Sequence, residues 1–185
     1  MISIRCIELE DLPIIQKWRN EESLRKFFRE YRDFSITQKK DWYHKILKDN
    51  RFEMYAIVED GKVNDNSYCY PAGNRIVGVC GLTYIDWVNR HCDLHFYIGE
   101  NFKWIDEEYA PQAIKIILKK AFCTFNMNKV WAEIYEIDKK KLDFFKNLNF
   151  KVDAELREHY FYEGKYHSSF ILSLLKNDYD VRTLQ

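Results

Sequence analysis

The sequence of 185 residues contains only six glycines and three prolines, and it has no net charge because 29 Lys and Arg residues balance 29 Asp and Glu residues. A general nucleic-acid binder needs a basic excess to neutralise phosphates, so that class is disfavoured. No apolar run approaches the roughly 18 residues of a membrane span, and no basic segment followed by an apolar one opens the chain. We therefore expect a cytoplasmic protein with no nucleic-acid or membrane partner.

Cysteine pairs and common catalytic motifs are also missing. The five cysteines are widely spaced and form no C-x-x-C pair: Cys6, Cys69, Cys80, Cys92 and Cys123. This excludes a zinc framework and disfavours disulfides, so reduced thiols are expected, with Cys80 and Cys92 in the core and no metal bound. The motifs of dinucleotide-binding, P-loop, α/β-hydrolase and zincin enzymes do not occur.

What the sequence does have is a large aromatic and apolar content, 17% and 46% of the residues, which predicts one folded domain over residues 1–185. Ser35 and Gln38 have the spacing of a capping box, and the helix after it would place Trp42, Tyr43, Ile46 and Leu47 on one stripe. Periodicity predicts the remaining elements: strand 2–7, helix 11–29, strand 53–59, loop 60–74, strands 75–86 and 91–99, helix 107–125, strand 129–136, helix 139–147, and strands 150–153, 156–162 and 166–174. This order predicts an α+β (mixed α/β) domain with a mostly antiparallel sheet of about seven strands flanked by helices.

Several local strings, in this order, resemble a known family. They are Asp11-Leu12, Trp18-Arg19-Asn20, Trp42-Tyr43, Val77-Gly78-Val79-Cys80-Gly81-Leu82, Ile85-Asp86-Trp87, Phe96-Tyr97-Ile98-Gly99, Tyr109-Ala110, Lys129-Val130-Trp131-Ala132-Glu133, Leu148-Asn149-Phe150, Leu156-Arg157-Glu158 and Gly164-Lys165-Tyr166. Together the chain resembles the GNAT superfamily of acyl-CoA-dependent N-acetyltransferases, and within it the ribosomal-protein N-terminal and nucleotide-amino-sugar acetyltransferases.

The resemblance implies where acetyl-CoA, the co-substrate, is held. Strands 91–99 and 129–136 would splay to admit pantetheine, and the diphosphate would rest on backbone N–H groups at the start of helix 107–125. The cofactor-binding residues implied in this way are Phe96, Tyr97, Ile98, Lys103, Ile105, Asp106, Glu107, Glu108, Tyr109, Ala110, Asp138, Lys141 and Phe145.

The phosphate loop departs from the family pattern. The family form is Arg/Gln-x-x-Gly-x-Gly/Ala, but residues 103–110 read Lys-Trp-Ile-Asp-Glu-Glu-Tyr-Ala and contain no glycine. Three acidic side chains would repel a diphosphate unless they point to solvent, with Lys103 offsetting part of the charge. Acidic residues in a first turn also stabilise a helix that binds no ligand. The loop is therefore compatible with a phosphate site and with a helix N-terminus that binds no ligand.

The catalytic candidates are Glu133, His95 and Asp93. Glu133 lies on strand 129–136, at a position where some N-terminal acetyltransferases carry a glutamate that acts through water, so it is the expected base. Asp93 and His95 share one face of the preceding strand and could hold or deprotonate the amine; a cross-strand polar pair is the alternative. The usual acid tyrosine is replaced by Phe145.

The acceptor is expected to be a primary amine of a small molecule, possibly a nucleotide-linked amino sugar, because aromatic rings and Arg side chains suit a base and a diphosphate. A protein N-terminus as acceptor, a non-catalytic binding module of this fold, and a homodimer also remain compatible with the sequence. The substrate-binding candidates are Arg25, Arg29, Trp42, Tyr43, Trp87, Arg90, Tyr160 and Tyr166.

Overall fold

The computed structural model describes residues 1–59 and 75–179. The chain divides into two compact units, the first made of Met1–Thr83 and His95–Ile117 and the second of Tyr84–Leu94 and Leu118–Gln185. The predicted loop 60–74, with Cys69, lies outside the described residues, and a single domain over 1–185 stays a prediction. Within the described ranges, no helix has the length and hydropathy needed to cross a membrane.

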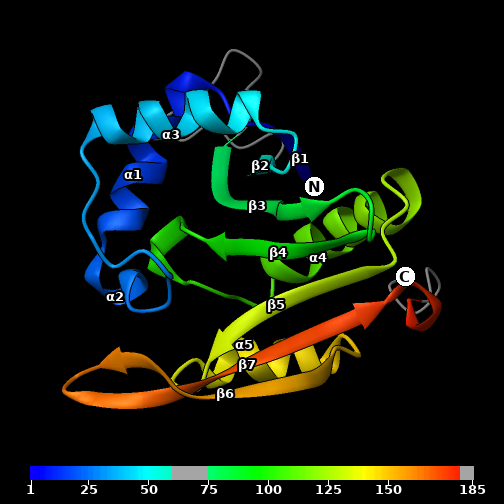
Figure 1. The fold of residues 1–185 in the computed structure, drawn as a ribbon. Helices are drawn as coiled ribbons and strands as arrows, with labels where there is room; N and C mark the ends of the chain where they lie inside the picture. The colour runs from blue at the N-terminus through cyan, green and yellow to red at the C-terminus, as the bar shows by residue number, and fades with distance from the viewer. Residues whose placement is uncertain (60–74, 180–185) are drawn as a thin grey trace. The chain divides into compact units, whose positions relative to one another are not determined.

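Seven strands form one sheet in the order β1-β2-β3-β4-β5-β7-β6 (Figure 1). They are β1 Ile2–Cys6, β2 Glu53–Glu59, β3 Arg75–Asp86, β4 His91–Ile98, β5 Lys129–Tyr135, β6 Lys151–Tyr162 and β7 Lys165–Leu175. The pairs β1–β2, β2–β3, β5–β7 and β6–β7 are antiparallel, whereas β4 and β5 are parallel. The predicted α+β fold with seven mostly antiparallel strands is confirmed.

The parallel register of β4 and β5 joins His91–Asp93 to Lys129–Trp131, within the second unit. The expected separation of the later halves of these strands involves residues of both units and stays a prediction.

The predicted helical segment 11–29 is confirmed in part, because it forms two helices, α1 Leu12–Asn20 and α2 Glu22–Arg25, after a 3-10 turn over Leu9–Asp11. Glu21 between them has an extended backbone, with φ −66° and ψ 124°. The Asn20 side chain also exchanges two hydrogen bonds of 2.9 Å with the backbone of Phe34. These bonds give the chain an alternative to continuing the helix and turn it toward the next segment.

Helix α3, Ile36–Lys48, begins with the predicted capping box. Ser35 Oγ accepts from the Gln38 N–H at 3.2 Å, and Gln38 Oε1 accepts from the Ser35 N–H at 2.9 Å. Tyr43 and Ile46 are buried as expected, but Leu47 is 63% exposed, so its predicted place on the buried stripe is wrong. The buried face instead starts with Lys39, four residues before Tyr43 and seven before Ile46.

The core of the first unit joins these helices to its strands. It includes Leu12 and Trp18 of α1, Tyr43 of α3, Tyr97 of β4 and Trp104 after β4. The fourth helix, α4 Tyr109–Lys119, continues as a π-helical turn over Lys120–Thr124, so the predicted helix 107–125 is confirmed with slightly shorter ends.

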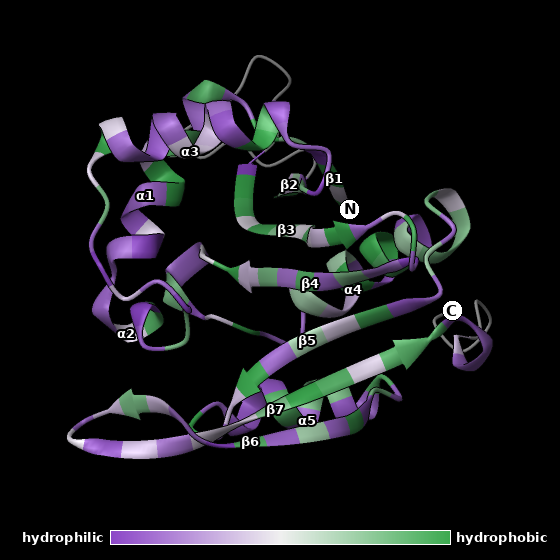
Figure 2. Cartoon of the chain, in the orientation of Figure 1, coloured by the Kyte–Doolittle hydropathy of each residue, from purple (hydrophilic) through white to green (hydrophobic). Residues whose placement is uncertain are grey.

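In the second unit, alternation along β5 follows the prediction, since Val130, Ala132 and Ile134 are buried. Helix α5, Lys139–Asn147, covers one face of β5 and its neighbours (Figure 1). The predicted strands 150–153 and 156–162 are one strand, β6, interrupted by two register shifts. β6 is mostly hydrophilic, whereas β7 is hydrophilic in its first half and mostly hydrophobic in its second half (Figure 2). A final 3-10 turn spans Lys176–Asp178.

The two cysteines expected in the core, Cys80 on β3 and Cys92 on β4, are fully buried. Burial raises the pKa of the Cys92 thiol to about 12 and that of Cys80 further. Both therefore stay protonated at neutral pH and act as small apolar residues.

Candidate functional site

After Gly99, which follows β4 directly, the segment Glu100–Glu108 that leads to α4 makes its turns without glycine. Asn101, Phe102 and Trp104 have φ values of 51°, 54° and 63°, in the left-handed region that side chains disfavour. Each such residue costs roughly 1 kcal/mol. The missing loop glycines are therefore replaced by strained backbone that other contacts must hold in place.

Trp104 supplies those contacts. Its N–H donates to Ile98 O at 2.9 Å, and the Ile98 N–H donates back to Trp104 O at 2.8 Å. Its ring stacks on Phe27 at a centroid distance of 5.0 Å and on Tyr97 at 6.1 Å. The loop is thus pinned to the end of β4.

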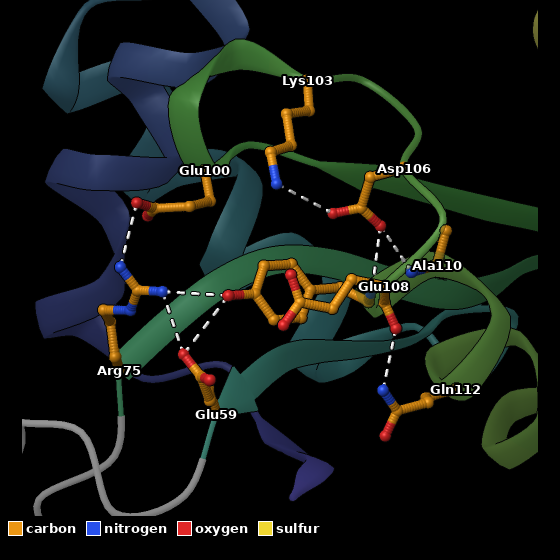
Figure 3. A network of polar contacts seen from close by, with 9 residues as sticks. Glu59, Arg75, Glu100, Lys103, Asp106, Glu108, Ala110 and Gln112 are labelled. Carbon is orange, nitrogen blue, oxygen red and sulfur yellow. Dashed lines mark hydrogen bonds and ion pairs between the residues drawn. The ribbon is translucent and has the colours of Figure 1, made fainter.

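Asp106 occupies the N-terminus of α4 (Figure 3). Its Oδ1 accepts hydrogen bonds from the backbone N–H groups of Tyr109, at 2.8 Å, and Ala110, at 2.9 Å. Lys103 Nζ lies 3.5 Å from Asp106 Oδ2, so Lys103 offsets this charge as expected. The Asp106 side chain points to the amides and not to solvent, and it takes the place that an anion would take there.

The neighbouring residues do not restore an anion site. Glu107 and Glu108 are exposed, and Pro111 has no N–H to donate. In this structure the α4 N-terminus therefore does not fit a diphosphate, because two of its donors already bind a carboxylate.

A polar network centred on Arg75 links the start of α4 to strands β2 and β3 (Figure 3). Arg75 donates to Glu59 at 2.9 Å, to Glu100 at 3.0 Å and to the Tyr109 hydroxyl at 3.1 Å. Burial alone would lower the pKa of Arg75, but the Glu59 hydrogen bond and the Glu100 charge outweigh it and raise the pKa. Burial also raises the pKa of the Tyr109 hydroxyl, with Glu59 adding to the effect. The network fixes the first residue of α4.

The other candidates of the first unit lie on β4 and the helices. Phe96, Tyr97 and Ile98 are buried, and His95 packs its ring on Phe28 at 6.3 Å and on Tyr97 at 5.7 Å.

Arg25 forms an ion pair with Asp33. Arg29 is exposed and Ile105 partly buried. Tyr43 is buried, and the Trp42 ring lies 3.6 Å from Lys39 Nζ. Trp42, an acceptor candidate, therefore contacts a buried ammonium group.

In the second unit, the side chains of Ser169 on β7 and His159 on β6 meet Glu133 on β5. Glu133 Oε1 accepts from Ser169 Oγ at 2.8 Å, and His159 Nε2 lies 3.4 Å from the same oxygen. The Glu133 side chain is 11% exposed and that of His159 is 52% exposed. A largely buried carboxylate is thus joined to solvent through an imidazole, an arrangement suited to moving a proton.

The cofactor candidates around α5 have structural contacts. Asp138 is buried and caps α5, with Oδ1 accepting from the Lys141 N–H at 3.1 Å. Lys141 is 8% exposed, and Phe145 is fully buried with its ring 4.8 Å from that of Phe150. Their roles toward acetyl-CoA stay predictions.

The remaining candidates of this unit are dispersed. Asp93 is buried on β4. The Trp87 ring packs on Phe125, and Arg90 Nη1 donates to Phe125 O at 3.4 Å. Tyr160 stacks on Tyr135 with centroids 3.9 Å apart. Tyr166 is 66% exposed beside Phe161.

The sequence patterns did not single out Ser169 or Lys39. Ser169 reaches Glu133 only through the pairing of β5 with β7, which short-range patterns do not reveal. Lys39 had a signal, since it shares the helical phase of Tyr43 and Ile46. No group of three or more His, Cys, Asp or Glu side chains in residues 1–59 and 75–179 has metal-site geometry.

Comparisons with known proteins agree on the fold. An uncharacterized N-acetyltransferase of Bacillus licheniformis is 21% identical over 178 residues, which are 96% of this chain and 94% of the relative. The spermidine N(1)-acetyltransferase of Escherichia coli K12 is 20% identical, over 96% of this chain and 88% of its own length. The crystal structure of the Vibrio cholerae spermidine N-acetyltransferase with CoA and spermine superposes with a TM-score of 0.82, at 20% identity and 96% coverage of both chains.

Two of these relatives revise the expected subgroup, since they are named as spermidine enzymes and not as ribosomal-protein or amino-sugar acetyltransferases. The superfamily itself is confirmed, because the model of the family described as "Acetyltransferase (GNAT) domain" matches residues 2–151. The chain therefore belongs to the acetyltransferase (GNAT) domain family, whose enzymes transfer an acetyl group from acetyl-CoA to an amine.

Proposed function

We propose that this protein transfers the acetyl group of acetyl-CoA to a primary amine of a small acceptor, with Glu133 as the general base. The observation that supports this role is the joint contact of Glu133 Oε1 with Ser169 Oγ and His159 Nε2. Acetyl-CoA supplies the activated acyl group. The protein's own residues must then orient the amine and remove its proton.

The position of Glu133 suits the removal of the amine proton. An amine attacks a thioester only in its neutral form, so a nearby group has to take a proton. The Ser169 hydroxyl holds one carboxylate oxygen in place, and His159, which is half exposed, passes the proton on to water. A carboxylate without such a neighbour would have to release its proton directly to bulk water.

The acceptor has two candidate classes. Polyamines are suggested by the relatives, two of which are named for spermidine. A nucleotide-linked amino sugar is suggested by the Arg and aromatic residues of the sequence. A panel containing spermidine, amino sugars and a peptide N-terminus separates these classes, because each product has a different mass.

The test compares two carboxylates with similar neighbours. Glu133→Gln should lower kcat by a factor of about 10²–10⁴, the usual contribution of a general base. Glu136→Gln is the matched control, because Glu136 accepts from the Ser168 N–H at 3.1 Å and lies 3.8 Å from His167, yet is 53% exposed. Equal kcat values for the two variants would overturn the assignment of Glu133.

Asp106 and Phe145 favour a second candidate, a binding module of this fold without turnover, because the anion site is occupied and the usual acid is missing. That candidate predicts that no amine of the panel is acetylated by the wild-type protein. Any N-acetyl product that depends on the enzyme excludes it.

A further inference from the structure

Two cations in the first unit, buried Lys39 and partly buried Arg19, form no ion pair with an acidic side chain among the described residues. Lys39 on α3 is 5% exposed, and its Nζ lies 3.6 Å from the centroid of the Trp42 ring. Arg19 on α1 stacks its guanidinium on the Phe28 ring at 3.5 Å. Buried charges in proteins are normally paired with a charge of opposite sign, so this pair needs an explanation.

The two cations lie in one cluster. Arg19 Cζ is 5.6 Å and Lys39 Nζ is 5.8 Å from the centroid of the same ring, that of Phe34. Phe34 is held in turn through its backbone carbonyl, which accepts from Gln16 Nε2 at 2.6 Å and from Asn20 Nδ2 at 2.9 Å. The cluster is therefore built on a fixed segment and does not depend on freely moving surface side chains.

Two hydrogen-bond donors in this region of the first unit are unused. Among the described residues, neither Arg19 Nη1 nor the Tyr97 hydroxyl has a hydrogen-bond partner, although both atoms are buried. Tyr97 interacts electrostatically with Arg19 and is 1% exposed. A partly buried guanidinium, a buried ammonium and a buried phenol hydroxyl are together the donors that a carboxylate or a phosphate accepts from.

The acidic group that interacts with Arg19 is already engaged. Glu30 interacts with Arg19, but its carboxylate binds Arg32 through two bonds of 2.9 Å and 2.8 Å. Arg19 itself reaches only the backbone carbonyl of Glu30, at 3.4 Å. Burial lowers the pKa of Lys39 to about 7, with the charge of Arg19 adding to the effect, and no acid offsets it in the part of the chain that the structure describes.

We propose that Arg19, Lys39 and Tyr97 form a binding site for a small anion carrying a carboxylate or a phosphate. The consequence for catalysis rests on the proposed function. The amine that accepts the acetyl group then also carries a carboxylate or a phosphate, and a purely cationic polyamine is a poor substrate. A ligand of this kind would pair both cations and satisfy Arg19 Nη1 and the Tyr97 hydroxyl.

The first test is binding, which needs no turnover. Inorganic phosphate should raise the Tm of the wild-type protein in a saturable way. Lys39→Met should weaken this binding roughly tenfold to hundredfold, the loss expected for one charged hydrogen bond, and Tyr97→Phe should weaken it less. Lys40→Met is the matched control, since Lys40 is exposed on the same helix. Phosphate that leaves Tm unchanged, or equal binding by the Lys39→Met and Lys40→Met variants, would overturn the site.

The second test identifies the source of the anion. Glucosamine 6-phosphate and glucosamine carry the same amine and differ in the phosphate. If the anion belongs to the acceptor, kcat/KM should be at least tenfold higher for the phosphorylated sugar in the wild-type protein and equal for both sugars in Lys39→Met. Phosphate binding with equal use of both sugars assigns the site to a free anion. Phosphate binding without any acetylation keeps the site and rejects the proposed function.

Discussion

Replacement of Lys39 by Met should make the protein more stable at neutral pH, by an amount that depends on pH. Lys39 is 5% exposed, and burial together with Arg19 lowers its pKa from 10.5 to about 7. One pKa unit corresponds to 1.36 kcal/mol. At pH 7 the folded protein holds this proton in about half of its molecules while the unfolded chain keeps it, and this difference costs about 4 kcal/mol. This figure is an upper bound, because the contact with Trp42 favours the charged form.

The sign follows from proton counting. Between pH 7 and 10.5 the unfolded chain binds more protons at Lys39 than the folded protein does, so the free energy of unfolding of the wild-type rises with pH. Lys39→Met lacks this contribution. Its advantage over the wild-type should fall by about 2 kcal/mol between pH 7 and pH 9.

Urea unfolding of both proteins at the two pH values measures this difference, and all other titrating groups cancel in it. Lys40→Met serves as the control, because Lys40 is exposed and should give an advantage near zero at both pH values. A difference between wild-type and Lys39→Met that does not change with pH would refute the burial of an uncompensated ammonium.

Three further substitutions test the segment around α4. Asp106→Ala should lower the free energy of unfolding by about 1 kcal/mol through loss of the helix cap, yet tighten CoA binding in calorimetry. The exposed control Glu107→Ala should keep the cap. Unchanged CoA affinity for Asp106→Ala would count against competition between Asp106 and CoA for the α4 amides. Gly99→Ala places a Cβ 2.0 Å from the Trp18 ring, so a loss of roughly 3 kcal/mol is expected in urea unfolding, and a loss under about 0.5 kcal/mol, the usual surface effect, would contradict the packing. Phe102→Gly relieves a φ of 54° and should raise stability by about 1 kcal/mol; a lower Tm would show that the ring contributes more than the strain costs.

Most of the fold was predictable because it depends on local periodicity. The strand Glu53–Glu59 and the helix Lys139–Asn147 have the predicted bounds, and the capping box at Ser35 forms as its spacing requires. The helix over 11–29 was not predictable in detail, since its break involves a contact between Asn20 and Phe34, fourteen residues apart.

The candidate site was less predictable, for two physical reasons. Asp106 has the same chemistry whether it faces solvent or its own helix, and only the loop conformation selects the second. His159 reaches Glu133 through the β5–β7–β6 pairing, with a register shift between Leu156 and Tyr160. No local pattern encodes a three-strand register of this kind.

Product formation tests the central claim most directly. The wild-type protein should release one free CoA thiol for each N-acetylated amine found by mass spectrometry, when acetyl-CoA is supplied with primary amines that include spermidine and glucosamine 6-phosphate. Thiol release without an acetylated amine, or no release with any acceptor, would contradict the assignment of an N-acetyltransferase activity to this chain.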